Sequence, residues 1–209
     1  MSNQPKIYWT PTEYLAHERA ADSKHEYWAG AVYAMAGASA RHNLIVTNLI
    51  AELRTQLKSR RDCTVYPSDL RVKTSATGLY TYPDVVVVCG KPQFEDDIQD
   101  TLLNPTVIVE VLSKSTESYD RGAKFEHYRT LDSLAEYILV AQNSYHVDHY
   151  VRQPDAQWLF SEAKELEHVV ELSSISCTLA VAELYDKVEL PLRPRVLKEM
   201  NQAEHYSTQ

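Results

Sequence analysis

The sequence predicts an α/β protein with a mixed β-sheet core flanked by helices and with additional antiparallel strands. Three observations carry this prediction: a long amphipathic helix early in the chain, two short β-branched segments that each contain a carboxylate, and a helix between the second segment and a run of later strands. This order of elements is typical of a mixed sheet covered by helices. No composition break marks a second domain, so we expect one domain over residues 1–190 and a polar tail over residues 191–209.

The N-terminal part contains two helix signals and one hairpin signal. Thr10 and Glu13 have the spacing of a capping box, so we expect a helix from there to about residue 22. Two short strands are expected over residues 25–35, with a turn at Ala29 and Gly30. Ser39 caps a long helix to about residue 58, because apolar residues recur at helical spacing after it.

The rest of the chain alternates strands with few helices. After the second acid-bearing segment, residues 113–120 are rich in capping residues and predict the start of a helix that runs to about Leu131. A short helix is expected over residues 179–185. Period-two alternation and turn residues predict strands over residues 63–66, 69–74, 81–88, 105–112, 136–141, 145–153, 157–164 and 168–172.

The net charge of −8 argues against wholesale non-specific binding of nucleic acid, but it leaves room for a local basic face. Such a face is one interpretation of a basic cluster within twenty residues, and a solvated helix end is the other. The cluster consists of Arg54, Lys58, Arg60, Arg61, Arg71 and Lys73.

The three cysteines, Cys63, Cys89 and Cys177, are odd in number and contain no Cys-x-x-Cys pair. We therefore expect a reduced, cytoplasmic protein without structural zinc. No apolar run approaches the roughly 18 residues that span a bilayer, and the N-terminus lacks the features of a signal peptide. We therefore expect no membrane partner.

The carboxylates in the two β-branched segments are Asp84 and Glu110. A carboxylate in a buried strand is costly unless it is paired, protonated or bound to a metal ion. Two of them on adjacent strands can share one Mg²⁺ or Mn²⁺, since hard cations prefer carboxylate, carbonyl and water oxygens. The backbone carbonyl of Val111 is the expected third ligand. Such an ion can orient a water and offset charge on a phosphoryl group.

An ammonium beside the two acids would complete such a site, and Lys124 is the residue that we predict for this role. Lys124 and Tyr128 are four residues apart on the predicted helix and share a face, and this helix directly follows the Glu110 strand. Asp120 also lies four residues from Lys124. The alternative is therefore a local ion pair between these two side chains.

Three further residues are candidate members of the site. Glu26 in the early hairpin and Asp69 before the Asp84 strand can extend the acidic cluster, or Glu26 caps a turn and Asp69 pairs with Arg71. His42 can contact phosphate or be a half-buried helix residue.

His146, Asp148 and His149 resemble a metal motif at first sight. On a strand, however, the side chain of His149 lies on the face opposite His146 and Asp148. We therefore do not expect these three residues to form one metal site.

Several of these residues stand in an order that resembles the Uma-two family of restriction-endonuclease-like proteins, part of the nuclease superfamily with the Pro-Asp…(Asp/Glu)-x-Lys signature. The likeness covers most of the chain and is fairly specific in its combination of motifs. The residues and motifs that carry the likeness are His25 to Tyr27, Gly30, Met35, His42, Asn48-Leu49, Ser68-Asp69, Pro83-Asp84, Ile108 to Ser113, Ser115-Thr116, Tyr119-Asp120, Lys124, Tyr128 and Glu136-Tyr137.

The resemblance implies a restriction-endonuclease-like fold and a metal-dependent DNA endonuclease with Asp84, Glu110 and Lys124 as catalytic residues and Mg²⁺ or Mn²⁺ as cofactor. Leu112 occupies the position where the superfamily signature has its lysine, so the resemblance implies that the lysine has moved to the following helix. A homodimer would suit the cutting of both DNA strands.

Two other interpretations remain open. One is an inactive nuclease fold that serves as a nucleic-acid-binding or dimerisation module, which the acidic charge and Leu112 favour. The other is a metallohydrolase with a different substrate. The chain has neither a Gly-x-x-x-x-Gly-Lys loop nor a Gly-x-Ser-x-Gly elbow, which argues against nucleotide triphosphate hydrolysis and against an α/β-hydrolase.

Overall fold

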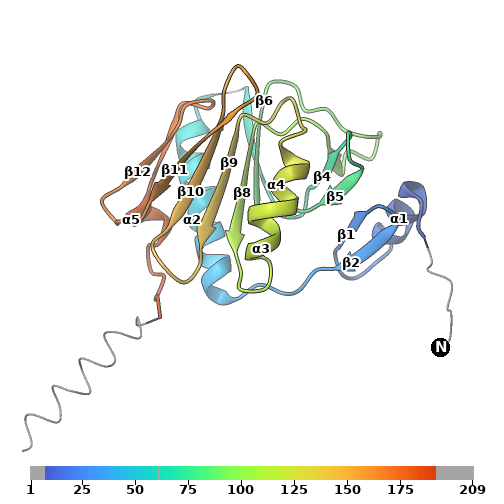
Figure 1. Ribbon diagram of the computed structural model, residues 1–209, viewed down its shortest axis with the longest axis horizontal. Coiled ribbons are helices and arrows are strands. Elements are labelled where there is room, and N and C mark those ends of the chain that lie inside the picture. The colour runs from blue at the N-terminus through green and yellow to red at the C-terminus, as the bar shows by residue number, and fades with distance from the viewer. Residues whose placement is uncertain (1–7, 61, 192–209) are drawn as a thin grey trace, which may run out of the picture.

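A six-stranded sheet forms the centre of the computed structural model, which describes residues 8–60 and 62–191 (Figure 1). Its strand order is β11-β10-β9-β8-β6-β3, and all neighbours are antiparallel except the parallel pair β8–β9. The strands are β3 (Cys63–Pro67), β6 (Val85–Cys89), β8 (Val107–Leu112), β9 (Glu136–Ala141), β10 (Val147–Arg152) and β11 (Trp158–Ala163).

Helices cover both faces of this sheet. On one face lies α2 (Ala40–Leu57), which Ser39 caps by accepting a hydrogen bond from the backbone of His42. Its buried residues, Ile45, Leu49, Leu53 and Leu57, recur every four positions and pack on the sheet. Burial of one such side chain stabilises the fold by about 1.5–3 kcal/mol. The structure confirms the predicted cap at Ser39 and the predicted long helix that follows it.

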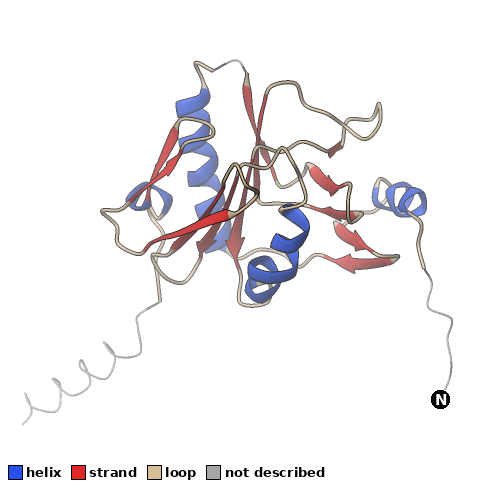
Figure 2. Ribbon diagram, turned by 45° about the horizontal axis from the view of Figure 1, so that its top comes forward, coloured by secondary structure: helices blue, strands red, loops and turns tan. Residues whose placement is uncertain are grey.

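The opposite face carries the segment that connects β8 to β9, as parallel neighbours require a crossover connection. This segment contains α3 (Glu117–Tyr119), a π-helical turn η1 (Asp120–Lys124) and α4 (Phe125–Tyr128) (Figures 1 and 2). The helix thus ends at Tyr128, before the predicted Leu131. Phe125 stacks on Tyr137 of β9, which anchors the segment to the sheet.

A second sheet, β2-β1-β5-β4-β7, lies beside the first and is followed at its outer side by α1 (Pro11–Glu18), which begins with the predicted capping box. A small sheet of β12 and β13, with α5, packs near α2. The remaining elements are β1 (His25–Trp28), β2 (Ala31–Ala34), β4 (Arg71–Thr74), β5 (Leu79–Thr81), β7 (Thr101–Leu102), β12 (Val169–Leu172), β13 (Cys177–Ala180) and α5 (Val181–Leu184).

The turn between β1 and β2 has positive φ at both Ala29 (49°) and Gly30 (84°), which matches the right-handed twist of a two-residue hairpin. This confirms the predicted hairpin. The expected α/β class, with a mixed sheet, flanking helices and extra antiparallel strands, is also confirmed. The expected C-terminal tail lies almost entirely outside the described residues, and a single domain over 1–190 stays a prediction.

The expectation about the cysteines is corrected. Cys63 and Cys89 form a disulfide, whereas Cys177 is free and buried, so the cysteines are not all reduced. The two partners are 26 residues apart in sequence but directly opposite in the β3–β6 register, which their spacing alone does not reveal.

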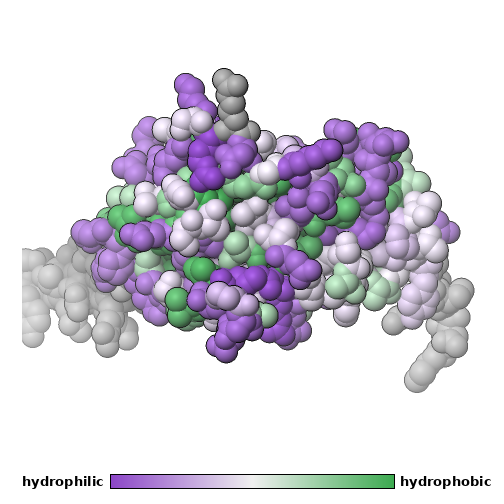
Figure 3. All heavy atoms as spheres, turned by 90° about the horizontal axis from the view of Figure 1, so that it is seen from above, coloured by the Kyte–Doolittle hydropathy of each residue, from purple (hydrophilic) through white to green (hydrophobic). Residues whose placement is uncertain are grey.

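Several residues of the basic cluster are engaged by acids, while Arg61 lies outside the described residues. Arg71 is buried and pairs with Asp100, while Lys73 pairs with Glu95 and Arg60 with Asp62. The face of the molecule shown in Figure 3 is mainly hydrophilic, with smaller hydrophobic areas between the polar ones. Within residues 8–60 and 62–191, none of the helices is both long enough and apolar enough to span a membrane.

Candidate active site

Asp84 lies at the point where the chain passes from the second sheet to the central one. It follows β5 and immediately precedes β6, rather than lying within one continuous strand as predicted. Its Oδ2 accepts a hydrogen bond from the backbone amide of Val111 at 2.7 Å. Asp84 is therefore fixed to β8, one residue beyond Glu110. The amide of Val111, rather than its carbonyl, makes this contact.

Glu110 lies on β8, with its side chain toward the crossover helix. Only 4% of Glu110 is exposed, and its Oε1 lies 2.9 Å from the Nζ of Lys124. Tyr128 donates a hydrogen bond from its hydroxyl to the same oxygen at 2.9 Å. Lys124 and Tyr128 thus share a helix face, as their spacing predicted, and that face meets Glu110. Lys124 does not point to solvent.

Two further carboxylates surround Lys124. The distance from Nζ is 3.3 Å to Oε1 of Glu26 on β1 and 3.4 Å to Oδ1 of Asp120 on the π-helical turn. Thr81 also donates its hydroxyl to Glu26. The local pair with Asp120 and the long-range contact with Glu110, which the sequence left as alternatives, therefore exist together.

Three carboxyl groups, those of Glu26, Glu110 and Asp120, surround the single ammonium group of Lys124, which is itself buried. Burial raises the pKa of Glu110 to about 8, and Asp120 and Asp84 act in the same direction against the opposing charge of Lys124. Burial likewise raises the pKa of Asp120. Burial alone would lower the pKa of Lys124, but the negative charge of Glu110, together with Glu26 and Asp120, raises it well above its usual value. The surrounding acids therefore favour the charged form of the lysine.

His42 contacts the second oxygen of Asp84, with its Nε2 2.9 Å from Oδ1. The first turn of α2 carries His42, so that turn and the amide of Val111 together fix both oxygens of Asp84. Each carboxylate oxygen still retains lone-pair capacity, since an ionised carboxylate can accept about four hydrogen bonds.

Asp69 does not join this group. It lies in the turn between β3 and β4, its side chain is 87% exposed, and it pairs with Lys24 at 3.0 Å. The predicted alternative, a pair with Arg71, is also wrong because Arg71 pairs with Asp100. The structure therefore brings Glu26 to the group but leaves Asp69 outside.

Asp120 was not predicted as a member of the acidic group, although its position four residues before Lys124 was a usable signal. Both residues belong to the π-helical turn, and such turns are frequent at functional sites. Tyr137 of β9 donates its hydroxyl to the carbonyl oxygen of Asp120 at 3.0 Å, a long-range contact that local residue spacing does not reveal.

The residues present suit a hard divalent cation. Asp84, Glu110 and Glu26 offer only oxygen donors, which a hard cation prefers, and Asp84 is close enough to Glu110 to raise its pKa. In the part of the chain that the structure describes, however, the ligand atoms of these three acids do not all lie within 4.8 Å of one another. Among the described residues, Lys124 is the one lysine or arginine that pairs with the carboxylates of this group.

A mixed sheet with one parallel pair, acids at its central strands and a lysine from the crossover helix together define a restriction-endonuclease-like α/β protein. The model of the family described as "Uma2: Putative restriction endonuclease" matches residues 11–182, and the chain belongs to this family. This confirms the resemblance of the sequence to the Uma-two family.

Two known proteins match most of this chain in sequence. Two proteins from Synechocystis sp. (strain ATCC 27184 / PCC 6803 / Kazusa), sll1609 and slr1290, both described as uncharacterized, are each 38% identical to this chain. The matches cover 78% and 87% of this chain, respectively, and 92% of each relative.

A crystal structure from Anabaena variabilis ATCC 29413, described as "a putative nuclease belonging to DUF820", superimposes with a TM-score of 0.70. The superposition covers 85% of this chain and 98% of the other, at 17% sequence identity. The two chains therefore share a fold.

Proposed function

We propose that this protein is a Mg²⁺- or Mn²⁺-dependent endonuclease that hydrolyses phosphodiester bonds in DNA. The observation that carries the proposal is the buried contact of 2.9 Å between Lys124 Nζ and Glu110 Oε1. It supports a Pro-Asp…(Asp/Glu)-x-Lys type of site in which the lysine comes from the helix after the strand. Membership of the Uma2 family supports the nuclease class.

The metal ligands in this proposal are the carboxylates of Asp84 and Glu110 and the backbone carbonyl of Val111, with Glu26 as an additional acid. When bound, the ion supplies a polarised water and offsets charge on the phosphate. His42 and the amide of Val111 hold Asp84 in position, and Tyr128 holds Glu110. Lys124 is the fixed cation that stabilises the phosphate charge and positions the attacking water.

A second feature supports an anionic substrate. A hollow of about 110 Å³ opens beside the end of β8, and its lining includes Lys114 and Arg121. Arg121 already pairs with Glu117 and Asp148, which leaves Lys114 for a phosphate. Phosphate oxygens are contacted mainly by Lys and Arg side chains. Cutting both strands of a duplex is simplest with two copies of the chain, so the proposal includes a homodimer on DNA.

The direct test is cleavage of supercoiled plasmid with Mg²⁺ or Mn²⁺. We expect Asp84→Asn, Glu110→Gln and Lys124→Met each to lower the cleavage rate by about 100-fold or more. Asp69→Asn is the matched control, because Asp69 is an exposed acid outside the group, and it should cleave like the wild type. Circular dichroism of each variant verifies folding.

Cleavage that survives all three substitutions would show that a different site is responsible. Absence of cleavage of any DNA or RNA by the wild type would favour the inactive, nucleic-acid-binding or dimerisation module. One observation is compatible with that second function: both oxygens of Asp84 already have protein partners.

A further inference from the structure

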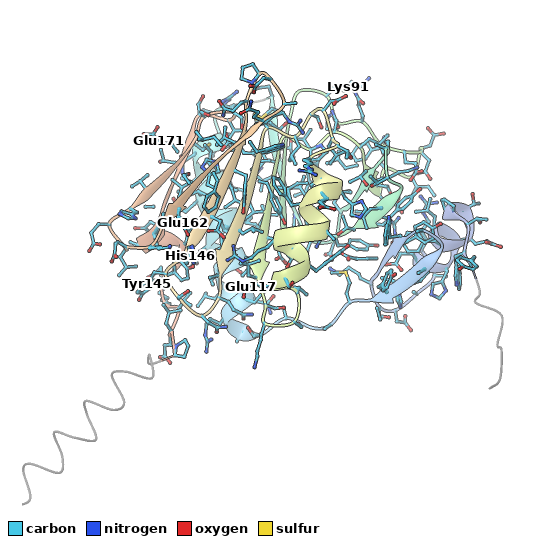
Figure 4. All side chains as sticks on the ribbon, in the orientation of Figure 1. Lys91, Glu117, Tyr145, His146, Glu162 and Glu171 are labelled. Atoms are coloured by element: carbon cyan, nitrogen blue, oxygen red, sulfur yellow. A yellow bond between two sulfur atoms is a disulfide. The ribbon has the colours of Figure 1, made fainter. Side chains whose placement is uncertain are left out.

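A second group of potential ligands lies on the outer strands of the central sheet, away from Asp84. It consists of His146 just before β10, Asp148 on β10 and Glu162 on β11. One ligand atom from each lies within 4.8 Å of the other two. Figure 4 shows His146 and Glu162 beside each other on these strands.

The β-sheet register explains why these three side chains meet. Asp148 and Glu162 are direct partners across the β10–β11 ladder, so their side chains share a face. His146 lies two residues before Asp148 and points to the same side. As predicted, His149 points to the other side; the structure shows that its Nε2 contacts Glu136 there. The sequence prediction missed Glu162 because strand pairing, rather than local spacing, brings it to this place.

Asp148 carries an oxygen that has no hydrogen-bond partner among the described residues. The residue is 1% exposed, and its Oδ1 is the unpartnered atom. The Nε2 of His146 lies only 2.9 Å away, but the pair is not aligned as a hydrogen bond; Nε2 is instead aligned with Oε1 of Glu162 at 3.1 Å. A buried carboxylate oxygen without a hydrogen bond is costly, so Oδ1, which His146 reaches only as an ion-pair contact, is available as a ligand atom in this group.

The surrounding contacts hold the group in place. The carbonyl oxygen of His146 accepts hydrogen bonds from the amide of Ala141 at 2.9 Å and from the hydroxyl of Tyr185 at 3.2 Å. Arg121 binds the other oxygen of Asp148 and leaves Oδ1 open. Support of this kind orients ligands in metal sites.

Lys164 is a further cation at the group, 2.8 Å from Oε1 of Glu162. Its side chain is 53% exposed, and an exposed ion pair of this kind contributes little to stability. Lys164 can therefore be displaced from Glu162 at little cost. His146 also borders the hollow beside β8, which gives an ion a route to the group.

We propose that His146, Asp148 and Glu162 bind a divalent transition-metal ion of the Zn²⁺ class at a site separate from Asp84 and Glu110. Imidazole with two carboxylates suits Zn²⁺, whereas Mg²⁺ prefers a set of oxygen ligands alone. The two sites therefore differ in the ion that they select.

The site joins parts of the chain that are distant in sequence. The ion links β10 to β11, and Asp148 connects them through Arg121 to the π-helical turn that also contains Lys124. The ion has a structural role in this arrangement, since it fixes the sheet edge that supports this helix.

The test is calorimetric titration of the metal-free full chain with Zn²⁺, in excess Mg²⁺ to occupy sites made of oxygen ligands alone. We expect one equivalent of Zn²⁺ to bind the wild type, and His146→Ala and Glu162→Gln to weaken this binding by about 10-fold or more. Both side chains are partly exposed, at 24% and 37%, so the variants should fold. Matched controls are the exposed residues of the neighbouring segment, His168→Ala and Glu171→Gln, which should bind like the wild type.

Nitrogen NMR of the imidazole groups provides an independent readout, since Zn²⁺ should shift Nε2 of His146 and Mg²⁺ should not. The proposal is overturned if the wild type binds no Zn²⁺, or if all five proteins bind it equally. It is also overturned if Zn²⁺ leaves the His146 signal unchanged, because the ion would then bind elsewhere and the three residues would be a hydrogen-bonded group only.

Discussion

At the scale of single residues, Glu110 determines the character of the buried acidic group. It contacts Lys124 and Tyr128, and burial raises its pKa to about 8 from an ordinary 4.5. A carboxyl group whose pKa is higher in the folded state stabilises the fold most below its ordinary pKa. This contribution declines as the pH rises toward 8.

The substitution Glu110→Gln should remove this decline, because glutamine is neutral at every pH. In the presence of a chelator we expect the variant to be as stable as the wild type at pH 5. At pH 8 it should be about 1–2 kcal/mol more stable, less than the full linkage value because Lys124 offsets part of the charge. Urea unfolding at both pH values measures the difference. A variant that is less stable than the wild type at pH 8 would show that Glu110 is ionised and well paired in the folded protein.

Addition of Mg²⁺ should reverse the order of the two proteins at pH 8. An ion that binds only the folded state stabilises it by about 2.7 kcal/mol at a free concentration of 100 times Kd. The wild type should gain this stability, and Glu110→Gln should gain less because it lacks one proposed ligand. Equal gains would argue against Glu110 as a metal ligand without reference to catalysis.

At the scale of secondary structure, local signals predicted most elements but not the pairing between them. The cap at Ser39, the apolar periodicity of α2 and the turn at Ala29-Gly30 are local, and all three were confirmed. Residues that meet through strand register were missed, namely Cys63 with Cys89 and Asp148 with Glu162.

The candidate site follows the same division between local and long-range information. The contact of Lys124 with Glu110 was predictable, since the helix directly follows its strand. The position of Asp69 outside the acidic group was not predictable. The sequence pattern placed Asp69 on a strand, whereas it lies exposed in the turn before β4. The two-residue strand β7 also escaped prediction, as so few residues give little periodicity, and residues 179–180 of β13 were predicted as part of a helix.

The π-helical turn is the element in which a single change is most informative. Gly122 lies within it without a positive φ, and a Cβ there would meet no atom within 4 Å. We therefore expect Gly122→Ala to stabilise the protein by about 0.5–1 kcal/mol, because alanine has less conformational freedom to lose on folding. Thermal unfolding of the variant and the wild type measures the effect.

Gly78→Ala is the matched control for this prediction. A Cβ at Gly78 would also meet no atom within 4 Å, but the φ of this residue is +73°. Alanine is strained in that conformation, so this variant should lose about 1 kcal/mol. If Gly122→Ala also loses stability, the turn needs a backbone conformation that alanine does not adopt.

At the scale of the whole molecule, the candidate site depends on the joint between two sheets. Glu26 comes from the smaller sheet and Glu110 from the central one, while Asp84 lies where the chain crosses between them. Lys124 comes from the helix that covers the central sheet and contacts both glutamates. The relative position of the sheets therefore determines the geometry of the acidic group.

The disulfide between Cys63 and Cys89 constrains one side of this arrangement, because it ties the outer strand β3 to β6, the strand that follows Asp84. Closure of a loop of 26 residues should stabilise the fold by about 3 kcal/mol through the lower entropy of the unfolded chain. We expect reducing agents to lower the free energy of unfolding by this amount. Urea unfolding with and without reductant measures it.

A double variant, Cys63→Ala with Cys89→Ala, provides the control, since its stability should not respond to reductant. In the wild type, thiol titration under denaturing conditions should count Cys177 alone before reduction and all 3 cysteines afterwards. Three reactive thiols in protein that has never met a reductant would contradict the disulfide and restore the expectation of a fully reduced chain. Backbone hydrogen bonds and apolar packing would then be what joins β3 to β6.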